Sequence, residues 1–322
     1  MQYPTPYVPA WMVTRWSKKL EEDTAITSEA ASWAVEAWIQ ALSKKIISTN
    51  KPQDTDVYLS KLVFPPDTPP VVNERKQQEI KISITQEISM HFVQIPAGEF
   101  LMGSIVSIDK EAQFSEIPQS KIFLDDFWIG KYPVTNQQYQ CFVQACKYRK
   151  PDHWFEGMIP AAKNNHPVVN VSWYDALEFC RWLTQITRLP IRLPGEAHWE
   201  KASRGIEGEI YPWGRSVPDS TRANYGNNNQ NTTPIGRFSP AGDSPFGIAD
   251  ASGNVREWTS TLFAPYPYIA SDGRESLQTN GMRVLRGGSW IDGRKDIRTA
   301  ARMKNAQTQS DPYTGFRCAW TP

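Results

Sequence analysis

Histidine, cysteine, net charge and long apolar runs are all scarce in this sequence. Its 322 residues contain four histidines and four cysteines, and these form no recognisable metal-binding cluster. Lysines and arginines number 35 against 34 aspartates and glutamates, so there is no basic excess with which to bind phosphates. No apolar run approaches the ~20 residues that a membrane-spanning helix needs. We therefore expect neither a nucleic acid nor a membrane as a partner.

The N-terminus also lacks the basic-then-apolar pattern of a secretion signal. A cytoplasmic location is therefore expected, in which cysteines stay reduced. Cys141 and Cys146 fall on one predicted helix and Cys180 on a second, while Cys318 lies near the C-terminus. We interpret all four as small hydrophobic side chains rather than as a disulfide framework.

Tryptophan is abundant by contrast, with thirteen copies, and two of them lie in a helical N-terminal region over residues 1–47. Residues 27–30 supply a helix N-cap followed by an acidic residue in the first turn. Trp33 and Trp38 recur with alanines at three- and four-residue spacing, so they form one apolar stripe. Two interpretations stay open: the stripe packs on the main domain, or the region is an adaptor that docks a second protein.

Residues 48–80 are predicted to be a linker, because prolines between Pro52 and Pro70 interrupt regular structure. From Ile80 to Ile84 apolar and polar residues alternate, which is typical of a half-buried strand. A further β-type run spans 90–100. We therefore assign residues 81–322 to one main domain.

Several helices and strands of this domain can be placed from local patterns. Residues 127–134 read as a strand, and Thr135 is a cap for a helix over 136–145. Residues 167–171 are predicted to form a short strand before an amphipathic helix over 174–187. A third helix is expected to begin within 191–200.

Three phrases near the C-terminus appear in a specific order: Gly253–Thr259 (GNVREWT), Arg283–Trp290 (RVLRGGSW) and Gly315–Trp320 (GFRCAW). Together with upstream phrases they resemble the formylglycine-generating enzyme family, also called the sulfatase-modifying-factor family. The resemblance covers about residues 90–320. It implies an α+β domain with a C-type-lectin-like fold and much irregular structure, here preceded by the small α-helical N-terminal region.

The catalytic chemistry of the family depends on two cysteines five residues apart, which bind copper(I) and activate oxygen. The matching positions in this chain are Asp292 and Ile297. Thiolates suit a soft cuprous ion, and carboxylate or alkyl groups do not, so no copper is expected. A related branch holds iron with histidines on a separate helical domain, but residues 1–80 contain no histidine. The resemblance therefore favours a non-catalytic protein.

Calcium is the cofactor that the resemblance implies. In the family the matching segment holds the ion through the side chains of Asp250 and Glu257 and the carbonyls of Ala251, Gly253 and Val255. These are the oxygen ligands that a hard cation prefers. A second family site would begin at Asn224 and Tyr225, but it lacks a matching carboxylate. The alternative to the first site is a structural turn in which Glu257 pairs with an arginine.

The polar stretch between the last two phrases is the predicted ligand-binding surface, because this segment faces ligands in the C-type-lectin fold. Aromatic and arginine residues dominate binding surfaces. Our candidate contacts are Trp290, Asp292, Arg294, Asp296, Ile297, Arg298 and Tyr313. Arg298 and Arg302 are alternatively ion pairs of the scaffold.

The same phrases resemble the variable proteins of diversity-generating retroelements, whose C-terminal segment is mutated at template adenines. Such mutation can yield Ile291, Asp292 and Gly293, but not Lys295 or Met303. The sequence thus predicts a non-catalytic recognition protein for a protein or peptide ligand on a calcium-stabilised scaffold. Two alternatives stay open, namely a formylglycine-generating-type oxidoreductase with an atypical active site and a structural subunit of a larger complex.

Overall fold

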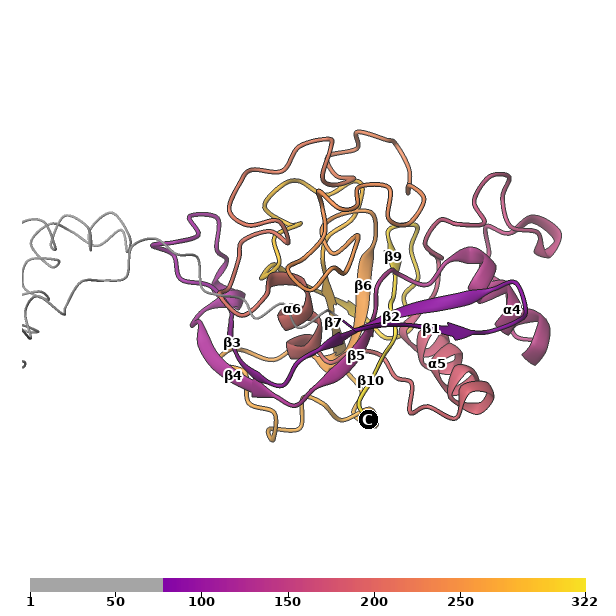
Figure 1. The fold of residues 1–322 in the computed structure, drawn as a ribbon, viewed down its shortest axis with the longest axis horizontal. Coiled ribbons are helices and arrows are strands. Elements are labelled where there is room, and N and C mark those ends of the chain that lie inside the picture. The colour runs from indigo at the N-terminus through magenta and orange to yellow at the C-terminus, as the bar shows by residue number, and fades with distance from the viewer. Residues whose placement is uncertain (1–77) are drawn as a thin grey trace, which may run out of the picture. The chain divides into compact units, whose positions relative to one another are not determined.

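The computed structural model describes residues 78–322, which form three β-sheets and three α-helices (Figure 1). The first sheet joins the start of this domain to its end, because its C-terminal strand pairs with an inner strand of the sheet. All of its strand pairs are antiparallel. In spatial order its strands are β1 (Glu79–Ser83), β2 (Ser89–Ile95), β5 (Phe127–Gly130) and β10 (Ala319–Trp320). The prediction of a strand after Ile80 is confirmed.

Two further sheets complete the β structure. A hairpin-like pair combines β3 (Gly98–Met102) with β4 (Ser120–Leu124). The strands of the third sheet, in spatial order, are β8 (Arg302–Ala306), β7 (Met282–Arg286), β6 (Arg256–Leu262) and β9 (Thr314–Gly315). Strand β9 runs parallel to β6, and the other pairs are antiparallel. This sheet carries the first two phrases of the family resemblance, and the last phrase runs from β9 to β10 of the first sheet.

Side-chain caps fix where the helices begin. Thr135 precedes α4 (Asn136–Cys146) and exchanges hydrogen bonds with Gln138 in a capping box. Ser172 and Asp175 form the same arrangement at the start of α5 (Trp173–Thr187). These reciprocal bonds satisfy backbone N–H groups that the first helical turn leaves unpaired. The predicted helices over 136–145 and 174–187 are therefore confirmed to within one residue.

The third helix and the short 3-10 turns lie among longer connections. Helix α6 spans Glu196–Arg204, so it begins inside the region 191–200 where a third helix was expected to begin. Single 3-10 turns occur at η1 (Phe114–Glu116) and η2 (Phe155–Gly157). The predicted strand over 167–171 is wrong. Of these residues only Pro167 forms a bridge, to Thr135, because the other backbone bonds go to separate loops.

Aromatic packing joins α4, α5 and the C-terminal strands into one hydrophobic core. Phe142 and Phe179 meet edge to face with ring centroids 5.8 Å apart, and Phe179 meets Phe316 at 5.4 Å. Such aromatic pairs contribute about 0.5–1.5 kcal/mol beyond the area they bury. This core fixes the third sheet against the two helices.

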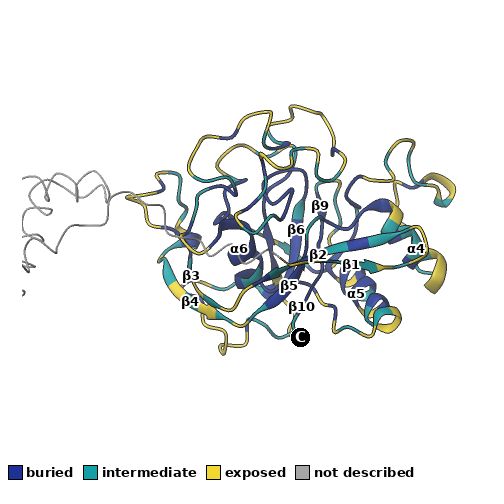
Figure 2. Cartoon of the chain, viewed as in Figure 1, coloured by how far each residue is buried: buried dark blue, intermediate teal, exposed yellow. Residues whose placement is uncertain are grey.

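Charged side chains form a second kind of core around α6. Arg286 and Arg302 both contact Glu196 of this helix, and all three side chains are fully buried. Figure 2 shows the buried residues gathered around α6 and β6, with exposed residues along the connecting loops. No helix of the described chain is long and apolar enough to cross a membrane.

Candidate functional site

Six of the seven predicted ligand contacts lie in the loop that connects β7 to β8, and the seventh, Tyr313, lies in the connection from β8 to β9. Two glycines begin the β7–β8 loop with positive φ, 86° at Gly287 and 65° at Gly288. A Cβ atom at Gly288 would lie 2.7 Å from the carbonyl oxygen of Asp296, so only glycine fits there. The close approach folds residues 289–297 back over the end of the third sheet.

Asp292 anchors this loop to the sheet rather than projecting freely. One carboxylate oxygen accepts hydrogen bonds from the backbone N–H and hydroxyl of Ser289, at 2.8 and 2.7 Å. The carboxylate also forms a two-point ion pair with the guanidinium of Arg256, whose Nε lies 2.8 Å from Oδ2. Burial acts to lower the pKa of Arg256, but its bonds with Asp292 outweigh this effect and raise it.

An aromatic pair borders this ion pair. The rings of Trp290 and Tyr313 are tilted with centroids 5.3 Å apart, and the guanidinium of Arg256 lies 5.6 Å from the centre of the Tyr313 ring. The indole Nε1 of Trp290 has no hydrogen-bond partner among the described residues. Both rings are partly exposed, so they offer a contact surface beside fixed charges.

The exposed part of the loop is short and charged. Arg294 is exposed and pairs with Glu111 at 2.9 Å, in a contact that water screens. Asp296 is half-buried, and burial raises its pKa, with Lys295 opposing the shift and Asp292 adding to it. None of the five candidate contacts Trp290, Asp292, Arg294, Asp296 and Tyr313 is buried: Arg294 is exposed and the other four are partly exposed.

Two candidate contacts point inward, which corrects the prediction for them. Ile297 is fully buried and packs with Tyr211 and Ala223. Arg298 is also fully buried and pairs with Glu116 at 2.7 Å and Asp109 at 2.6 Å. The loop turns its apolar side chain and this guanidinium into the domain, so neither residue can contact a ligand on this surface. The scaffold interpretation of Arg298 is the one the structure supports.

The predicted calcium segment contains buried oxygens with few partners. Asp250 is buried, and its Oδ2 accepts a hydrogen bond of 2.6 Å from the Gly236 N–H. The structure shows no hydrogen bond from the described residues to the carbonyls of Ala251, Gly253 or Val255. Because buried carbonyls are normally paired, three unpaired ones beside a carboxylate fit a hard cation.

Glu257 has other partners. Its two carboxylate oxygens accept hydrogen bonds from Arg317, both at 2.6 Å, and one also accepts the Trp199 indole N–H at 2.8 Å. Burial raises the pKa of Asp250 to about 6; the Gly236 N–H and Arg317 oppose this shift, and Glu257 adds to it. The negative charges of Asp250 and Glu257 therefore repel each other, and Arg317 forms an ion pair only with Glu257.

The weaker second site is a hydrogen-bonded turn. The Asn224 side chain donates to the Asn231 carbonyl at 2.9 Å and accepts from Asn229 at 2.9 Å. The Tyr225 hydroxyl donates to the Pro218 carbonyl at 2.7 Å. No group of three or more His, Cys, Asp or Glu side chains in the described part of the chain is placed to hold a metal. The turn therefore already uses the Asn224 side chain and the Tyr225 hydroxyl, and the second calcium site stays a prediction.

Arg256 is the residue that the sequence reasoning missed at this site. It immediately precedes Glu257 in strand β6, so the two side chains lie on opposite faces of the sheet. That alternation was a usable signal: if Glu257 faces inward, Arg256 faces the loop. The predicted partner-binding residues Trp33 and Trp38 lie outside the described residues.

A comparison with known sequence families agrees with this architecture. The profile of the sulfatase-modifying factor enzyme 1-like domain matches residues 77–322, which is most of the chain. The chain belongs to the formylglycine-generating enzyme, or sulfatase-modifying-factor, family.

Individual relatives differ in how much of their length is shared. Serine/threonine-protein kinase pkn1 of Chlamydia pneumoniae is 31% identical over 271 residues, which cover 78% of this chain but 41% of that protein. The inactive C-alpha-formylglycine-generating enzyme 2 of Bos taurus is 30% identical over 288 residues, covering 72% of this chain and 88% of that protein. The structure of Treponema denticola variable protein 1 aligns with a TM-score of 0.63 at 21% identity, covering 76% of this chain and 99% of that one. At this identity the last comparison shows the fold alone.

Proposed function

We propose that this protein is a non-catalytic recognition protein that binds a protein or peptide ligand at the β7–β8 loop and the adjoining Tyr313. The observation that carries the proposal is the Arg256–Asp292 ion pair. It occupies the position where the family resemblance places the first catalytic cysteine, and buried Ile297 occupies that of the second. An ion pair and a buried isoleucine thus stand at the positions where the family resemblance places the two catalytic cysteines.

The remaining surface suits binding. Trp290 and Tyr313 offer partly exposed aromatic rings, and Arg294 and Asp296 add charges of both signs. Aromatic residues bury a large area with few rotatable bonds, which lowers the entropy lost on binding. A relative that is named as inactive and shares 30% identity supports a scaffold used without catalysis.

The proposal includes one structural calcium ion, held by Asp250 and the carbonyls of Ala251, Gly253 and Val255, with Glu257 alongside. Its support is the unpaired state of these buried oxygens. The ion would neutralise the buried carboxylate that Arg317 leaves uncompensated. A retroelement origin for the loop sequence stays part of the proposal and can be read from the neighbouring genes.

Selection from a displayed random-peptide library tests the binding surface. The test variant replaces Arg294, Asp296 and Tyr313 with alanine, and the matched control replaces Arg181, Asp152 and Tyr174, three exposed residues of the same types elsewhere. Peptides selected on the unmodified protein should lose affinity at least tenfold for the test variant and should bind the control unchanged. Equal binding to both variants would place the surface elsewhere.

A second measurement tests the absence of catalysis. The purified protein is offered copper(I) and a sulfatase-type cysteine peptide, and the peptide is then examined by mass spectrometry. We expect no stoichiometric copper and no formylglycine. Detection of either would replace the recognition proposal with the alternative of an oxidoreductase with an atypical active site.

A further inference from the structure

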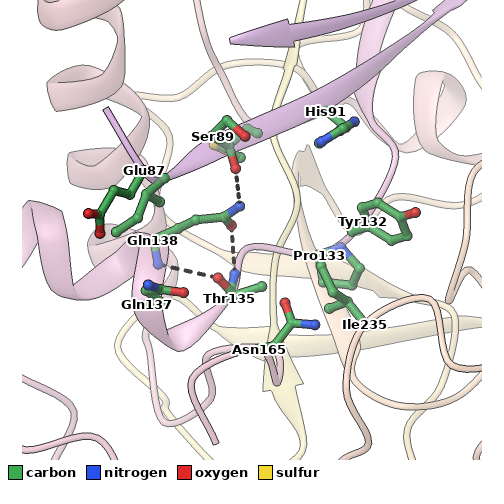
Figure 3. A pocket seen from close by; sticks show the side chains of 12 residues that line it. Glu87, Ser89, His91, Tyr132, Pro133, Thr135, Gln137, Gln138, Asn165 and Ile235 are labelled. Atoms are coloured by element: carbon green, nitrogen blue, oxygen red, sulfur yellow. Dashed lines mark hydrogen bonds between the residues drawn. The ribbon is translucent and has the colours of Figure 1, made fainter. Parts of the chain in front are cut away.

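A pocket separate from the β7–β8 loop lies between the first sheet and helix α4. It has a volume of about 300 Å³ and is lined by residues from the β1–β2 turn, from β2, from the β5–α4 connection, from the first turn of α4 and from the two loops that hold Asn165 and Ile235. Figure 3 places Glu87 and Gln138 on one side of this hollow, His91 and Tyr132 on the other, and Asn165 below. This volume lies at the lower end of the range for small-molecule sites.

The walls of the pocket are held in place by hydrogen bonds that do not involve a ligand. Gln138 accepts from the Thr135 N–H at 2.9 Å and donates to the Ser89 carbonyl at 2.8 Å, which joins α4 to β2. The Ile235 N–H donates to the Asn165 carbonyl at 2.9 Å, which joins the two loops. The hollow is therefore formed before any ligand arrives, and little ordering entropy is lost on binding.

The rim carries polar side-chain groups that these bonds leave unused. None of the following has a hydrogen-bond partner within the described chain: the Glu87 carboxylate, the Ser89 and Tyr132 hydroxyls, the His91 Nε2 and the amides of Gln137 and Asn165. Together they supply both donors and acceptors. Between them lie apolar surfaces of Met90, Pro133 and Ile235.

The charges of the rim narrow the ligand class. Neither a lysine nor an arginine lines the pocket, and Glu87 carries a negative charge, so phosphate, sulfate and carboxylate ligands are disfavoured. A cation would meet one exposed carboxylate, an attraction that water and salt screen strongly. A neutral molecule whose hydroxyls both donate and accept, and whose C–H face packs on the apolar wall, matches the whole lining.

We propose that this pocket binds a neutral, hydroxyl-rich small molecule the size of a single sugar ring. The site is independent of the β7–β8 loop, and it needs no metal ion. Because each hydrogen bond adds little net affinity, we expect weak binding, with a dissociation constant on the order of 1 mM.

The test uses the full chain and four probes: D-glucose, D-mannose, D-galactose and N-acetyl-D-glucosamine. Saturation-transfer NMR reports binding, and the side-chain amide signals of Gln137, Gln138 and Asn165 report its place. At least one sugar should give a transfer signal and shift these amide signals. If none of the four does so, or if inorganic phosphate or L-arginine shifts them instead, the proposal is overturned.

Two neighbouring asparagines provide a matched pair of variants. Asn165 lines the pocket and Asn164 does not, although both are exposed. Asn165→Ala should weaken sugar binding about fivefold, the loss expected for one hydrogen bond. Asn164→Ala should leave it unchanged. Ile235→Trp should fill the hollow and abolish binding while the melting temperature stays near that of the unmodified protein. Equal effects of the two alanine variants, or sugar binding that survives in the folded tryptophan variant, would contradict the proposal.

Discussion

Arg317 and Glu257 form a fully buried ion pair in which two guanidinium nitrogens each lie 2.6 Å from a different carboxylate oxygen. Arg317 belongs to the last family phrase, and Glu257 lies in strand β6. The guanidinium also donates to the carbonyls of Gly130 and Ala249, both at 3.0 Å. One arginine thus joins the first sheet, the third sheet and the predicted calcium segment.

Removing one partner of this pair should destabilise the domain severely. Glu257→Gln keeps the shape of the side chain but leaves the Arg317 charge buried and poorly compensated. We expect a loss of about 3–5 kcal/mol in the free energy of unfolding, measured by urea denaturation. The control is Glu178→Gln, which breaks an exposed pair with Arg181 and should cost about 0.5 kcal/mol or less. Similar losses in the two variants would contradict the importance of burial.

Two isoleucines in the β7–β8 loop should respond oppositely to truncation. Ile297 is fully buried, so Ile297→Ala should cost about 2–5 kcal/mol through lost packing and the cavity left behind. Ile291 is 42% exposed, so Ile291→Ala should change stability by about 0.5 kcal/mol or less. Thermal melting of both variants decides the matter. If the Ile297→Ala protein melts at the same temperature as the unmodified protein, Ile297 is not buried in the folded protein.

Local patterns predicted what depends on neighbouring residues in the chain. The cap at Thr135 and the amphipathic helix α5 follow from a few adjacent side chains, so both could be placed in advance. The family phrases identified the scaffold. The strand expected over 167–171 failed because a strand needs a partner, and these residues bond to loops that the sequence pattern does not reveal.

The site was harder to predict because its contacts join distant segments. Asp292 meets Arg256 across 36 residues, and Arg298 meets Glu116 across 182. A polar stretch without periodicity looks uniformly exposed, yet the loop buries Ile297 and Arg298 and leaves Arg294 in solvent. In such an irregular loop, contacts with distant segments determine which residues are buried, and no local spacing rule predicts these contacts.

The four thiols should differ sharply in reactivity. Cys146 is exposed and Cys141 is partly exposed, whereas Cys180 and Cys318 are buried with their sulfurs 3.8 Å apart. Burial raises the pKa of Cys318, and the neighbouring Cys180 raises it further, so the reactive thiolate is suppressed. Brief iodoacetamide treatment followed by mass spectrometry should label Cys146 first and leave Cys180 and Cys318 intact until the protein is unfolded. Rapid labelling of the buried pair in the native protein would refute this.

Asp250 should make the metal-free protein less stable as the pH rises. Its pKa is raised by burial from 3.8 to about 6, so the folded protein binds more protons than the unfolded chain between these values. The stability contributed by protonated Asp250 is fully present below pH 3.8 and is lost as the pH rises through about 6. Asp250→Asn stays neutral, so its advantage over the unmodified protein should grow across this window, by up to about 3 kcal/mol. Urea denaturation in metal-free buffer at several pH values measures this difference, and a constant difference would exclude a raised pKa.

Calcium should reverse this penalty at neutral pH if Asp250 and the three unpaired carbonyls bind the ion. Only the folded protein presents these oxygens together, so calcium at 100 times its dissociation constant should add about 2.7 kcal/mol to the free energy of unfolding. Asp250→Ala removes the carboxylate without touching the Arg317–Glu257 pair, and it should abolish this response. The control Asp243→Ala removes a nearby carboxylate whose oxygen accepts a hydrogen bond from the Ser239 hydroxyl, and it should keep the response. A melting temperature that is insensitive to calcium in the unmodified protein would show that the buried oxygens serve the turn alone.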